Sequence, residues 1–188
     1  MSRPRHPLLA LDEALARLVD GARPMRITAN ETVSTFDARG RVLAADVSSL
    51  LDVPPADNTS MDGYAMRAAD VPAAGTELPV SQRIPAGVVG DALVPGTAAR
   101  IFTGAQVPPG ADAVVMQEQC EVVGADRVRI MAVATPGQWV RRRGEDVRQG
   151  ATVLAAGVRL TPQALGLAAS VGAATLQVLR RPRVTLFS

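Results

Sequence analysis

The first helical pattern lies near the start of the chain. Residues 8–20 carry four leucines spaced three or four positions apart, which places them on one helix face: Leu8, Leu11, Leu15 and Leu18. Gly21 follows them, and glycine is a common residue at the end of a helix. The spacing therefore predicts an amphipathic helix with one apolar face.

A second helix is predicted over residues 161–171. The segment begins with Thr-Pro, in which the threonine can cap the helix and the proline suits its first position. Leu160 can pack on Leu165 as a hydrophobic staple, and Gly172 can end the helix.

The middle of the chain has a different pattern. From about residue 46 to residue 140, Gly and Pro recur every few positions with short β-prone runs between them. This pattern is typical of a β-rich domain with tight connections. We expect a buried strand at residues 114–116 and a hairpin in which residues 121–123 and 127–130 flank the loop 124–126.

Two further strands are predicted at residues 175–179 and 183–187. The second of them is apolar and lies one residue from the end of the chain. A strand of this kind needs neighbouring strands. We therefore expect the sequence to be cut from a longer protein.

Composition narrows the class of protein. Apolar residues make up 47% of the chain and charged residues 20%, as in ordinary globular proteins. No apolar run reaches the roughly 18 residues needed to cross a bilayer, and acidic residues follow the short apolar patch near the N-terminus. We expect a cytoplasmic protein without a secretory signal or a membrane partner.

Two residue types exclude several kinds of chemistry. The single cysteine, Cys120, excludes an internal disulfide and a cysteine-based zinc site, and a small buried thiol is expected there. The single histidine, His6, lies in a polar tail. A Cys–His or Ser–His nucleophilic mechanism is therefore not expected.

The charge pattern argues against nucleic-acid binding. The net charge is +2 and every basic side chain apart from His6 is arginine, which raises the pI to 9.4. The arginines are scattered among nearly as many acids, and aromatic residues make up only 3% of the chain. Base-stacking surfaces need aromatic side chains. No nucleic-acid partner is therefore predicted.

The first cluster of polar side chains that could bind a ligand or take part in catalysis is in residues 54–65. This segment holds two carboxylates, two hydroxyls and an amide beside a double proline: Asp57, Asn58, Thr59, Ser60 and Asp62. Oxygen ligands in a rigid loop can hold a hard cation. A capped turn explains the same residues, because Asp, Asn and Ser favour turns, and the spacing alone favours this reading.

The second cluster is in residues 100–115. Thr103 and Gly104 follow an apolar pair, so the hydroxyl and nearby N–H groups can bind an oxyanion. The alternative is a strand end that leads into a Pro-Gly turn at residues 108–110, and the spacing alone favours this alternative. A P-loop is excluded because the chain has no lysine.

The third cluster is in residues 139–157, where three arginines adjoin Gly144, Glu145 and Asp146. Guanidinium groups suit phosphate or carboxylate, and the adjacent acids suit Mg²⁺. A self-neutralising surface turn is the alternative, since exposed ion pairs contribute only about 0–1 kcal/mol.

Five segments of the chain follow one another in a recognisable order: DNTSMDGYA (57–65), FTGAQVPPGADAVV (102–115), VRRRGED (140–146), LTPQALGLAASVG (160–172) and RPRVTLFS (181–188). Together and in this order, they resemble the molybdopterin molybdenumtransferase family, called MoeA in bacteria and represented in animals by the E domain of gephyrin. Thr59-Ser60 replaces Ser-Ala, and Phe102 replaces Met, relative to the family pattern. The family continues into Thr-Gly-Asp-Glu where this chain ends.

The resemblance implies an α+β fold with a discontinuous, elongated first domain of helices and strands, made from residues 1–45 and 141–178. A β-rich second domain, residues 46–140, is inserted into it. Residues 179–188 would be the first strand of a truncated, molybdopterin-binding third domain.

The resemblance also implies a reaction. The family carries out Mg²⁺-dependent insertion of molybdate into adenylylated molybdopterin with release of AMP, and this chain alone is expected to be inactive. The implied catalytic residues are Asp57, Thr103 and Asp146. The implied substrate-binding residues are Ser60, Asp62, Gly104 and Arg142. The implied magnesium ligands are Asp57, Glu145 and Asp146.

The partners implied by the resemblance are a second copy of the protein and a molybdopterin adenylyltransferase. In the family's homodimer, each active site lies between the second domain of one subunit and the third domain of the other. The alternative is a non-catalytic dimerisation or scaffold module, since the animal relative anchors receptors through its E domain.

Overall fold

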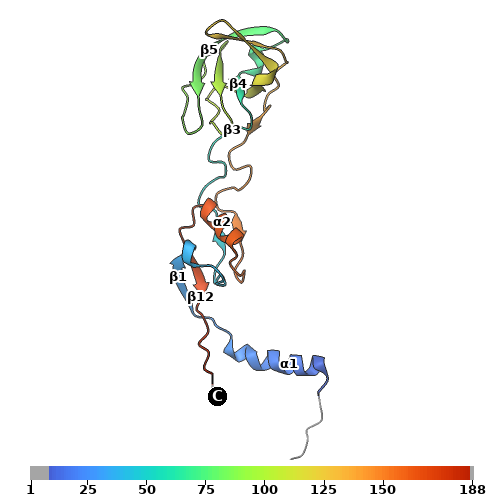
Figure 1. Ribbon diagram of the computed structural model, residues 1–188, viewed down its shortest axis with the longest axis vertical. Helices are drawn as coiled ribbons and strands as arrows, with labels where there is room; N and C mark the ends of the chain where they lie inside the picture. Colours follow the sequence, from blue (N-terminus) through green and yellow to red (C-terminus); the bar gives the residue numbers. More distant parts are fainter. Residues whose placement is uncertain (1–8, 187–188) are drawn as a thin grey trace, which may run out of the picture. The chain divides into compact units, whose positions relative to one another are not determined.

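The computed structural model describes residues 9–186 and divides into two compact units (Figure 1). One unit combines the chain up to Val47 with the chain from Val153 onward, and the other is Ser48–Thr152. A discontinuous unit with helices and strands and an inserted β-rich unit are therefore both present, as the α+β prediction requires. Leu8 and Phe187 of the predicted elements lie outside the described residues.

The second boundary between the units lies later than the sequence predicted. The return to the first unit was expected at residue 141, and the structure places it at Val153. Strand β10 (Val140–Arg141) pairs with β3 (Asn58–Thr59), and the N–H of Gly144 donates to the carbonyl of Pro54 at 2.9 Å. These long-range hydrogen bonds keep the segment that follows residue 140 in the β-rich unit.

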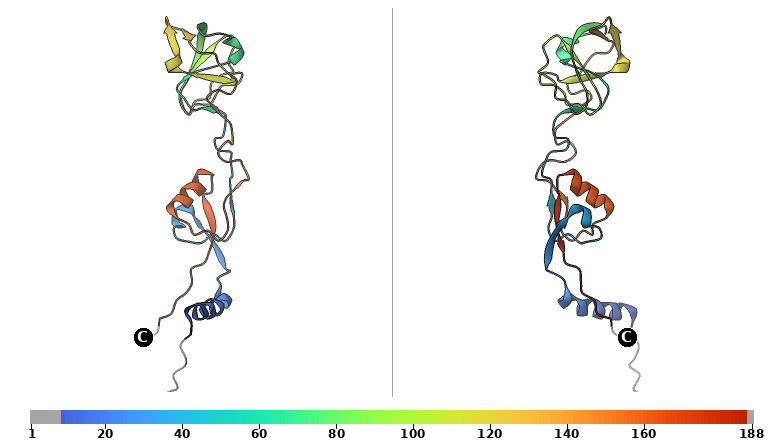
Figure 2. Two further views of the ribbon diagram at one scale, coloured as in Figure 1. Left: turned by 90° about the vertical axis from the view of Figure 1, so that its right-hand side faces the viewer. Right: turned by 60° about the vertical axis from the view of Figure 1, so that its left-hand side comes forward.

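The discontinuous unit is built around two paired strands and one helix. Strand β1 (Asn30–Ser34) runs antiparallel to β12 (Thr175–Leu179), and helix α2 (Pro162–Ser170) lies beside the pair (Figure 2). The hydroxyl of Thr161 accepts a hydrogen bond from the N–H of Ala164 at 3.3 Å, so the predicted cap is confirmed. The buried core of this unit comprises Ala38, Leu43, Val47, Leu160, Ala168, Ala173, Leu176 and Val178.

Helix α1 (Leu11–Ala22) has the predicted apolar face but buries none of it among the described residues. Leu11, Leu15 and Leu18 are 81%, 57% and 72% exposed. The helix also continues through Gly21 and is followed by the 3-10 turn η1 (Arg23–Met25), so the predicted end at Gly21 is wrong. Gly21 tolerates the helical conformation, and no neighbouring element stops the helix there.

The β-rich unit is a six-stranded sheet in the order β7-β4-β6-β5-β9-β8, with β5 and β6 parallel and the other neighbours antiparallel. Apolar side chains form two separate buried clusters in this unit. The strands are β4 (Gly63–Met66), β5 (Thr76–Ile84), β6 (Ala98–Ile101), β7 (Ala113–Met116), β8 (Cys120–Val123) and β9 (Arg127–Ile130). The predicted buried strand is β7, and β8 and β9 form the predicted hairpin, because Val123 pairs with Arg127 across the loop 124–126.

The remaining elements are short. Strand β2 (Val47–Ser48) pairs with β11 (Thr152–Leu154), and the other 3-10 turns are η2 (Thr35–Asp37), η3 (Ala68–Asp70) and η4 (Gln117–Gln119). Residues 183–186 do not form the predicted strand, since no described strand pairs with them. Within residues 9–186, no helix combines the length and apolar character needed to span a membrane.

Candidate functional site

Backbone hydrogen bonds bring the three polar clusters together within the β-rich unit. The N–H of Thr59 donates to the carbonyl of Ala105 at 3.0 Å, and the N–H of Gly104 donates to the carbonyl of Thr59 at 2.8 Å. The N–H of Ser60 donates to the carbonyl of Trp139 at 3.1 Å, which joins the third segment to the first. Residues 57–62, 103–107 and 139–146 therefore form one site, which we call the three-loop site.

Asp57 links the first loop to the third. Its Oδ2 accepts a hydrogen bond from Nη1 of Arg142 at 2.7 Å, and its Oδ1 accepts one from the backbone N–H of Arg143 at 2.8 Å. The N–H of Arg143, followed by the Arg142 guanidinium, lowers the pKa of Asp57 below its ordinary value. Asp57 therefore stays ionised at neutral pH and fixes the position of the Arg142 side chain.

Asp62 links the first loop to the second. Its Oδ1 accepts hydrogen bonds from the N–H of Thr103 at 2.8 Å and from the Thr103 hydroxyl at 2.7 Å. These two donors, together with the charge of Arg100, lower the pKa of Asp62. Because the hydroxyl proton of Thr103 is committed to Asp62, the lone pairs of the hydroxyl oxygen remain available as acceptors.

The glycine after Asp62 is required by close packing. A Cβ on Gly63 would lie 2.0 Å from the carbonyl oxygen of Val115 on the neighbouring strand β7. Gly63 is the first residue of β4, so the tight pairing of β4 with β7 fixes where the Asp62 side chain begins. The Asp-Gly-Tyr motif therefore combines an acid of the three-loop site with a strand start at which the neighbouring backbone leaves no room for a Cβ.

The second loop does not offer the expected oxyanion-binding N–H groups. The N–H of Thr103 donates to Asp62, and the N–H of Gly104 donates to the carbonyl of Thr59. The N–H of Ala105 donates to the carbonyl of Phe102 at 2.8 Å. These groups hold the loop together, as the strand-end alternative expects. Gly104 has a φ of 81°, which is the reason for a glycine at this position.

The third loop is partly self-neutralising. Nη2 of Arg141 lies 2.6 Å from both carboxylate oxygens of Asp146, and this pairing raises the pKa of Arg141. Oε2 of Glu145 accepts the N–H of Arg142 at 2.9 Å. Arg142 itself points away from these acids and toward Asp57. Donors within the third loop thus form hydrogen bonds with its two acids, whereas the Arg142 guanidinium bonds to Asp57 of the first loop.

Ser60 and Trp139 form a second link between the first and third loops. The Ser60 hydroxyl donates to the carbonyl of Trp139 at 3.3 Å, next to the backbone bond between the same residues. Trp139 has a φ of 53°, which is unusual for a residue other than glycine. Ser60 therefore holds the backbone of the third loop at Trp139, a residue that the sequence placed in the third cluster without giving it a role.

Asp52 is a member of the site that the sequence did not indicate. Its Oδ2 accepts Nε of Arg143 at 2.6 Å, and its Oδ1 accepts the N–H of Gln149 at 2.8 Å. The N–H of Gln149, then the Arg143 side chain, lowers the pKa of Asp52. Asp52 lies outside the quoted motifs, and its partners are 91 and 97 residues away, so no local pattern identifies it.

The expected magnesium ligands do not fit a cation site in this chain. Within residues 9–186, no three His, Cys, Asp or Glu side chains converge as a metal site. Asp57 accepts hydrogen bonds from the Arg142 guanidinium and the backbone N–H of Arg143, Asp146 accepts from Arg141, and Glu145 accepts from a backbone N–H. These three carboxylates are therefore already engaged with hydrogen-bond donors of the protein and do not converge on one point.

Comparisons with known proteins agree with the motifs. The family description "MoeA N-terminal region (domain I and II)" matches residues 9–172. Molybdopterin molybdenumtransferase 2 of Mycobacterium tuberculosis is 48% identical over 172 residues, which cover 89% of this chain and 42% of that protein. Molybdopterin molybdenumtransferase of Haemophilus influenzae is 35% identical over 181 residues, which cover 96% of this chain and 44% of that protein.

A solved structure is also similar. The crystal structure of the molybdopterin biosynthesis moeA protein from Pyrococcus horikoshii OT3 matches with a TM-score of 0.84 and 36% identity. The match covers 94% of this chain and 47% of that chain. This chain therefore spans less than half the length of the relatives it matches. The chain belongs to the molybdopterin molybdenumtransferase (MoeA) family and covers that family's N-terminal region.

Proposed function

We propose that this chain forms one half of the active site of an enzyme that inserts molybdate into adenylylated molybdopterin and releases AMP. The observation that carries the proposal is the three-loop site, in which Asp57 holds the Arg142 guanidinium and Asp62 holds the Thr103 hydroxyl. Family membership supports the molybdopterin chemistry. The gathering of the motif residues in one place supports this location for it.

The lowered pKa values of the two acids indicate their roles. A general acid or base works best with a pKa near the operating pH. The pKa values of Asp57 and Asp62 are lowered, which takes them further from neutral pH. In this proposal the two carboxylates therefore remain charged and position other groups. Asp57 positions Arg142, and Asp62 positions Thr103.

Arg142 and Thr103 are the groups proposed to touch the substrate. The Arg142 side chain is 58% exposed and uses one of its N–H groups for Asp57. A guanidinium has five N–H donors, so the others suit a phosphate or molybdate oxygen. The Thr103 oxygen can accept a hydrogen bond from the substrate.

Asp146 and Glu145 have a supporting role in this proposal. Asp146 binds Arg141 through both oxygens, and Glu145 holds the backbone of Arg142. They fix the loop that presents Arg142. Ser60 serves the same purpose through the carbonyl of Trp139.

Dimerisation is part of the same proposal, and helix α1 supports it. Its apolar side chains Leu11, Leu15 and Leu18 are exposed among the described residues, which is unfavourable in water unless a partner covers them. We propose a homodimer in which the partner's third domain completes the site, in the cytoplasm, with substrate supplied by a molybdopterin adenylyltransferase.

A fusion protein tests the reaction. Residues 1–188 are joined to the remaining C-terminal part of the Mycobacterium tuberculosis relative and supplied with adenylylated molybdopterin. We expect AMP release that depends on molybdate. If the fusion folds and dimerises but releases no AMP, the enzyme proposal fails and the scaffold alternative is supported.

A further inference from the structure

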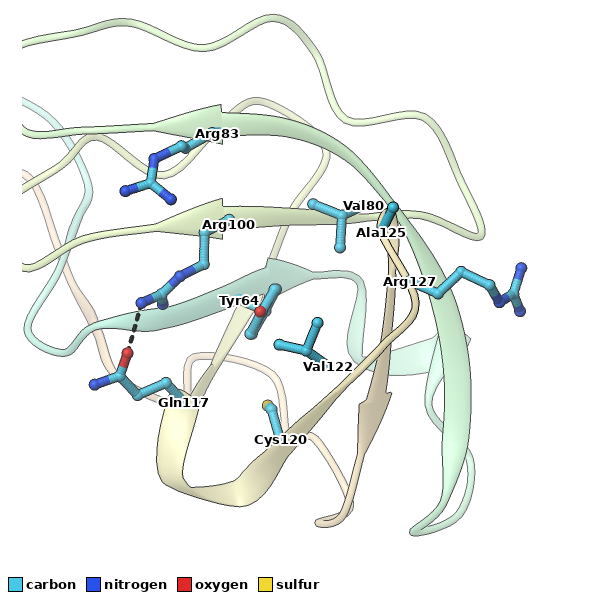
Figure 3. A pocket seen from close by; sticks show the side chains of 9 residues that line it. All are labelled: Tyr64, Val80, Arg83, Arg100, Gln117, Cys120, Val122, Ala125 and Arg127. Atoms are coloured by element: carbon cyan, nitrogen blue, oxygen red, sulfur yellow. Dashed lines mark hydrogen bonds between the residues drawn. The ribbon is translucent and has the colours of Figure 1, made fainter.

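A surface pocket of about 510 Å³ lies on one face of the six-stranded sheet, within the β-rich unit. Its lining includes a row of side chains at paired positions on three neighbouring strands. Tyr64 on β4 pairs with Arg100 on β6, and Arg100 pairs with Arg83 on β5. Figure 3 shows the guanidinium groups of Arg83 and Arg100 at the same end of this pocket.

This juxtaposition of two arginines is unfavourable by itself. Like charges directly opposite one another on adjacent strands destabilise a sheet. No carboxylate of the described residues lies within 4 Å of either guanidinium. By contrast, six other arginines of the β-rich unit form ion pairs: Arg67, Arg127, Arg129, Arg141, Arg142 and Arg143.

The protein nevertheless holds both guanidinium groups in place. Nη1 of Arg100 donates to the carbonyl of Gly63 at 2.8 Å, and Nη2 donates to Oε1 of Gln117 at 2.5 Å. The guanidinium carbons of Arg83 and Arg100 lie 4.4 Å and 4.5 Å from the centroid of the Phe102 ring. Positive charge is therefore fixed in position without an anionic partner.

The rest of the pocket is mainly apolar. Val80, Cys120 and Val122 line it beside Tyr64 (Figure 3). Burial raises the pKa of the Cys120 thiol to about 12, so the thiol stays protonated and serves as an apolar wall. Arg127 points away from the other two arginines in Figure 3 and is paired with Glu77.

We propose that this pocket binds a tetrahedral oxyanion, such as a phosphate group, at the end that Arg83 and Arg100 line. Paired guanidinium forks match the geometry of phosphate oxygens. An anion there removes the repulsion between the two side chains. The apolar wall next to them accepts an organic group attached to the phosphate. The inference is independent of the proposed function, because none of Arg83, Arg100 and Tyr64 is proposed to contact the molybdopterin substrate.

Arg83 is the better position for a test. Arg100 also supports the carbonyl of Gly63 and influences Asp62, so its removal has structural effects. The Arg83 side chain is exposed and makes no hydrogen bond among the described residues. Arg148 is a matched control, because it is an exposed arginine of the same unit outside the pocket.

Binding of inorganic phosphate and phenyl phosphate to the 188-residue chain is measured by NMR titration at low ionic strength. We expect saturable binding to the original chain, at least tenfold weaker binding to Arg83→Gln, and less than a twofold change in Arg148→Gln. Tighter binding of phenyl phosphate supports a phosphate ester as the ligand, and equal binding of the two probes supports a free oxyanion. No saturable binding, or an equal loss in both variants, overturns the proposal.

Thermal unfolding gives a second measurement that does not depend on detecting a weak complex. Without phosphate, Arg83→Gln is expected to melt at the same temperature as the original chain or higher, because the repulsion is removed. Added phosphate is expected to raise the melting temperature of the original chain and of Arg148→Gln, but not of Arg83→Gln. An equal rise in all three proteins contradicts the assigned site.

Discussion

The two units of this chain use their side chains in different ways. In the β-rich unit, short and irregular strands are held by two buried apolar clusters and by hydrogen bonds between distant loops. In the discontinuous unit, the longest helix of the described chain, α1, has a regular apolar face and buries no residue. A regular spacing of apolar residues therefore does not guarantee that a helix packs against the rest of its unit. Short strands without such a spacing can still form a buried core.

The largest expected difference between the units is the response to removing an apolar side chain. Ile101 is fully buried in the β-rich unit, and Leu15 on α1 is 57% exposed. Ile101→Ala is expected to lower the free energy of unfolding by about 2–5 kcal/mol. Leu15→Ala is expected to change it by less than about 0.5 kcal/mol.

Urea denaturation at a protein concentration that keeps the chain monomeric compares these two variants. The comparison between the units breaks down if Leu15→Ala destabilises the monomer as strongly as Ile101→Ala. That result would mean that α1 packs within the same chain.

The next largest difference between the units is the change in the free energy of unfolding when a glycine is replaced by alanine. A Cβ at Gly63 would lie 2.0 Å from the carbonyl oxygen of Val115, whereas a Cβ at Gly21 would meet nothing within 4 Å. Gly63→Ala is expected to lower the free energy of unfolding by about 1–3 kcal/mol, because the strands must separate. Gly21→Ala is expected to stabilise α1 by roughly 0.5–1 kcal/mol.

Chemical denaturation and helical circular dichroism measure these two effects. An unchanged stability of Gly63→Ala would show that β4 and β7 can move apart at little cost. The close packing that we assign to the Asp-Gly-Tyr motif would then be incorrect.

A smaller effect on the stability of the β-rich unit is expected from a change of pH. The pKa values of Asp52, Asp57, Asp62 and Glu77 are all lowered in the folded β-rich unit. Carboxyls of this kind stabilise the fold fully above their unfolded pKa, which is about 3.9 for Asp. Their contribution is lost as the pH falls below that value toward the folded pKa. The melting temperature should therefore stay level near neutral pH and fall below about pH 4.

The fluorescence of Trp139, the only tryptophan, follows this transition in the β-rich unit. Asp52→Asn should melt at a lower temperature at pH 7 and show a smaller further decrease on acidification. Parallel curves for the variant and the original chain would mean that Asp52 contributes nothing through its charge.

The sequence predicted the elements that depend on local interactions. The Thr-Pro start of α2, the strand β7 and the hairpin of β8 and β9 follow from caps, turns and short apolar runs, and all three are present. The resemblance assigned the motif residues to one family. It did not show how Asp57 and Arg142, 85 residues apart, contact each other.

The errors share a physical cause. The end of the inserted unit was placed too early because the pairing of β3 with β10 is long-range. The sequence left open whether the N–H groups of Thr103 and Gly104 bind an oxyanion, because their actual partners, Asp62 and the carbonyl of Thr59, come from another segment. Asp52 was missed for the same reason.

Asp52 and Asp57 provide the most direct test of the three-loop site. Each carboxylate holds one arginine side chain of the third loop and one backbone N–H, which belongs to Arg143 for Asp57 and to Gln149 for Asp52. The Asp52 side chain is the more buried of the two, at 17% exposed against 36%. Replacement by Asn therefore removes similar structural contacts at both positions. Only Asp57 positions Arg142, which is the proposed substrate ligand.

The decisive measurement is the rate of molybdate-dependent AMP release by the fusion protein carrying either Asp57→Asn or Asp52→Asn, with a melting curve for each. We predict that Asp57→Asn lowers the rate at least about 100-fold, because Arg142 loses the carboxylate that positions it and can no longer stabilise charge in the transition state. Asp52→Asn should keep the rate within a few-fold while lowering the melting temperature as much or more. Equal losses of rate, or near-normal turnover in Asp57→Asn, would contradict the assignment of the site to Asp57 and Arg142.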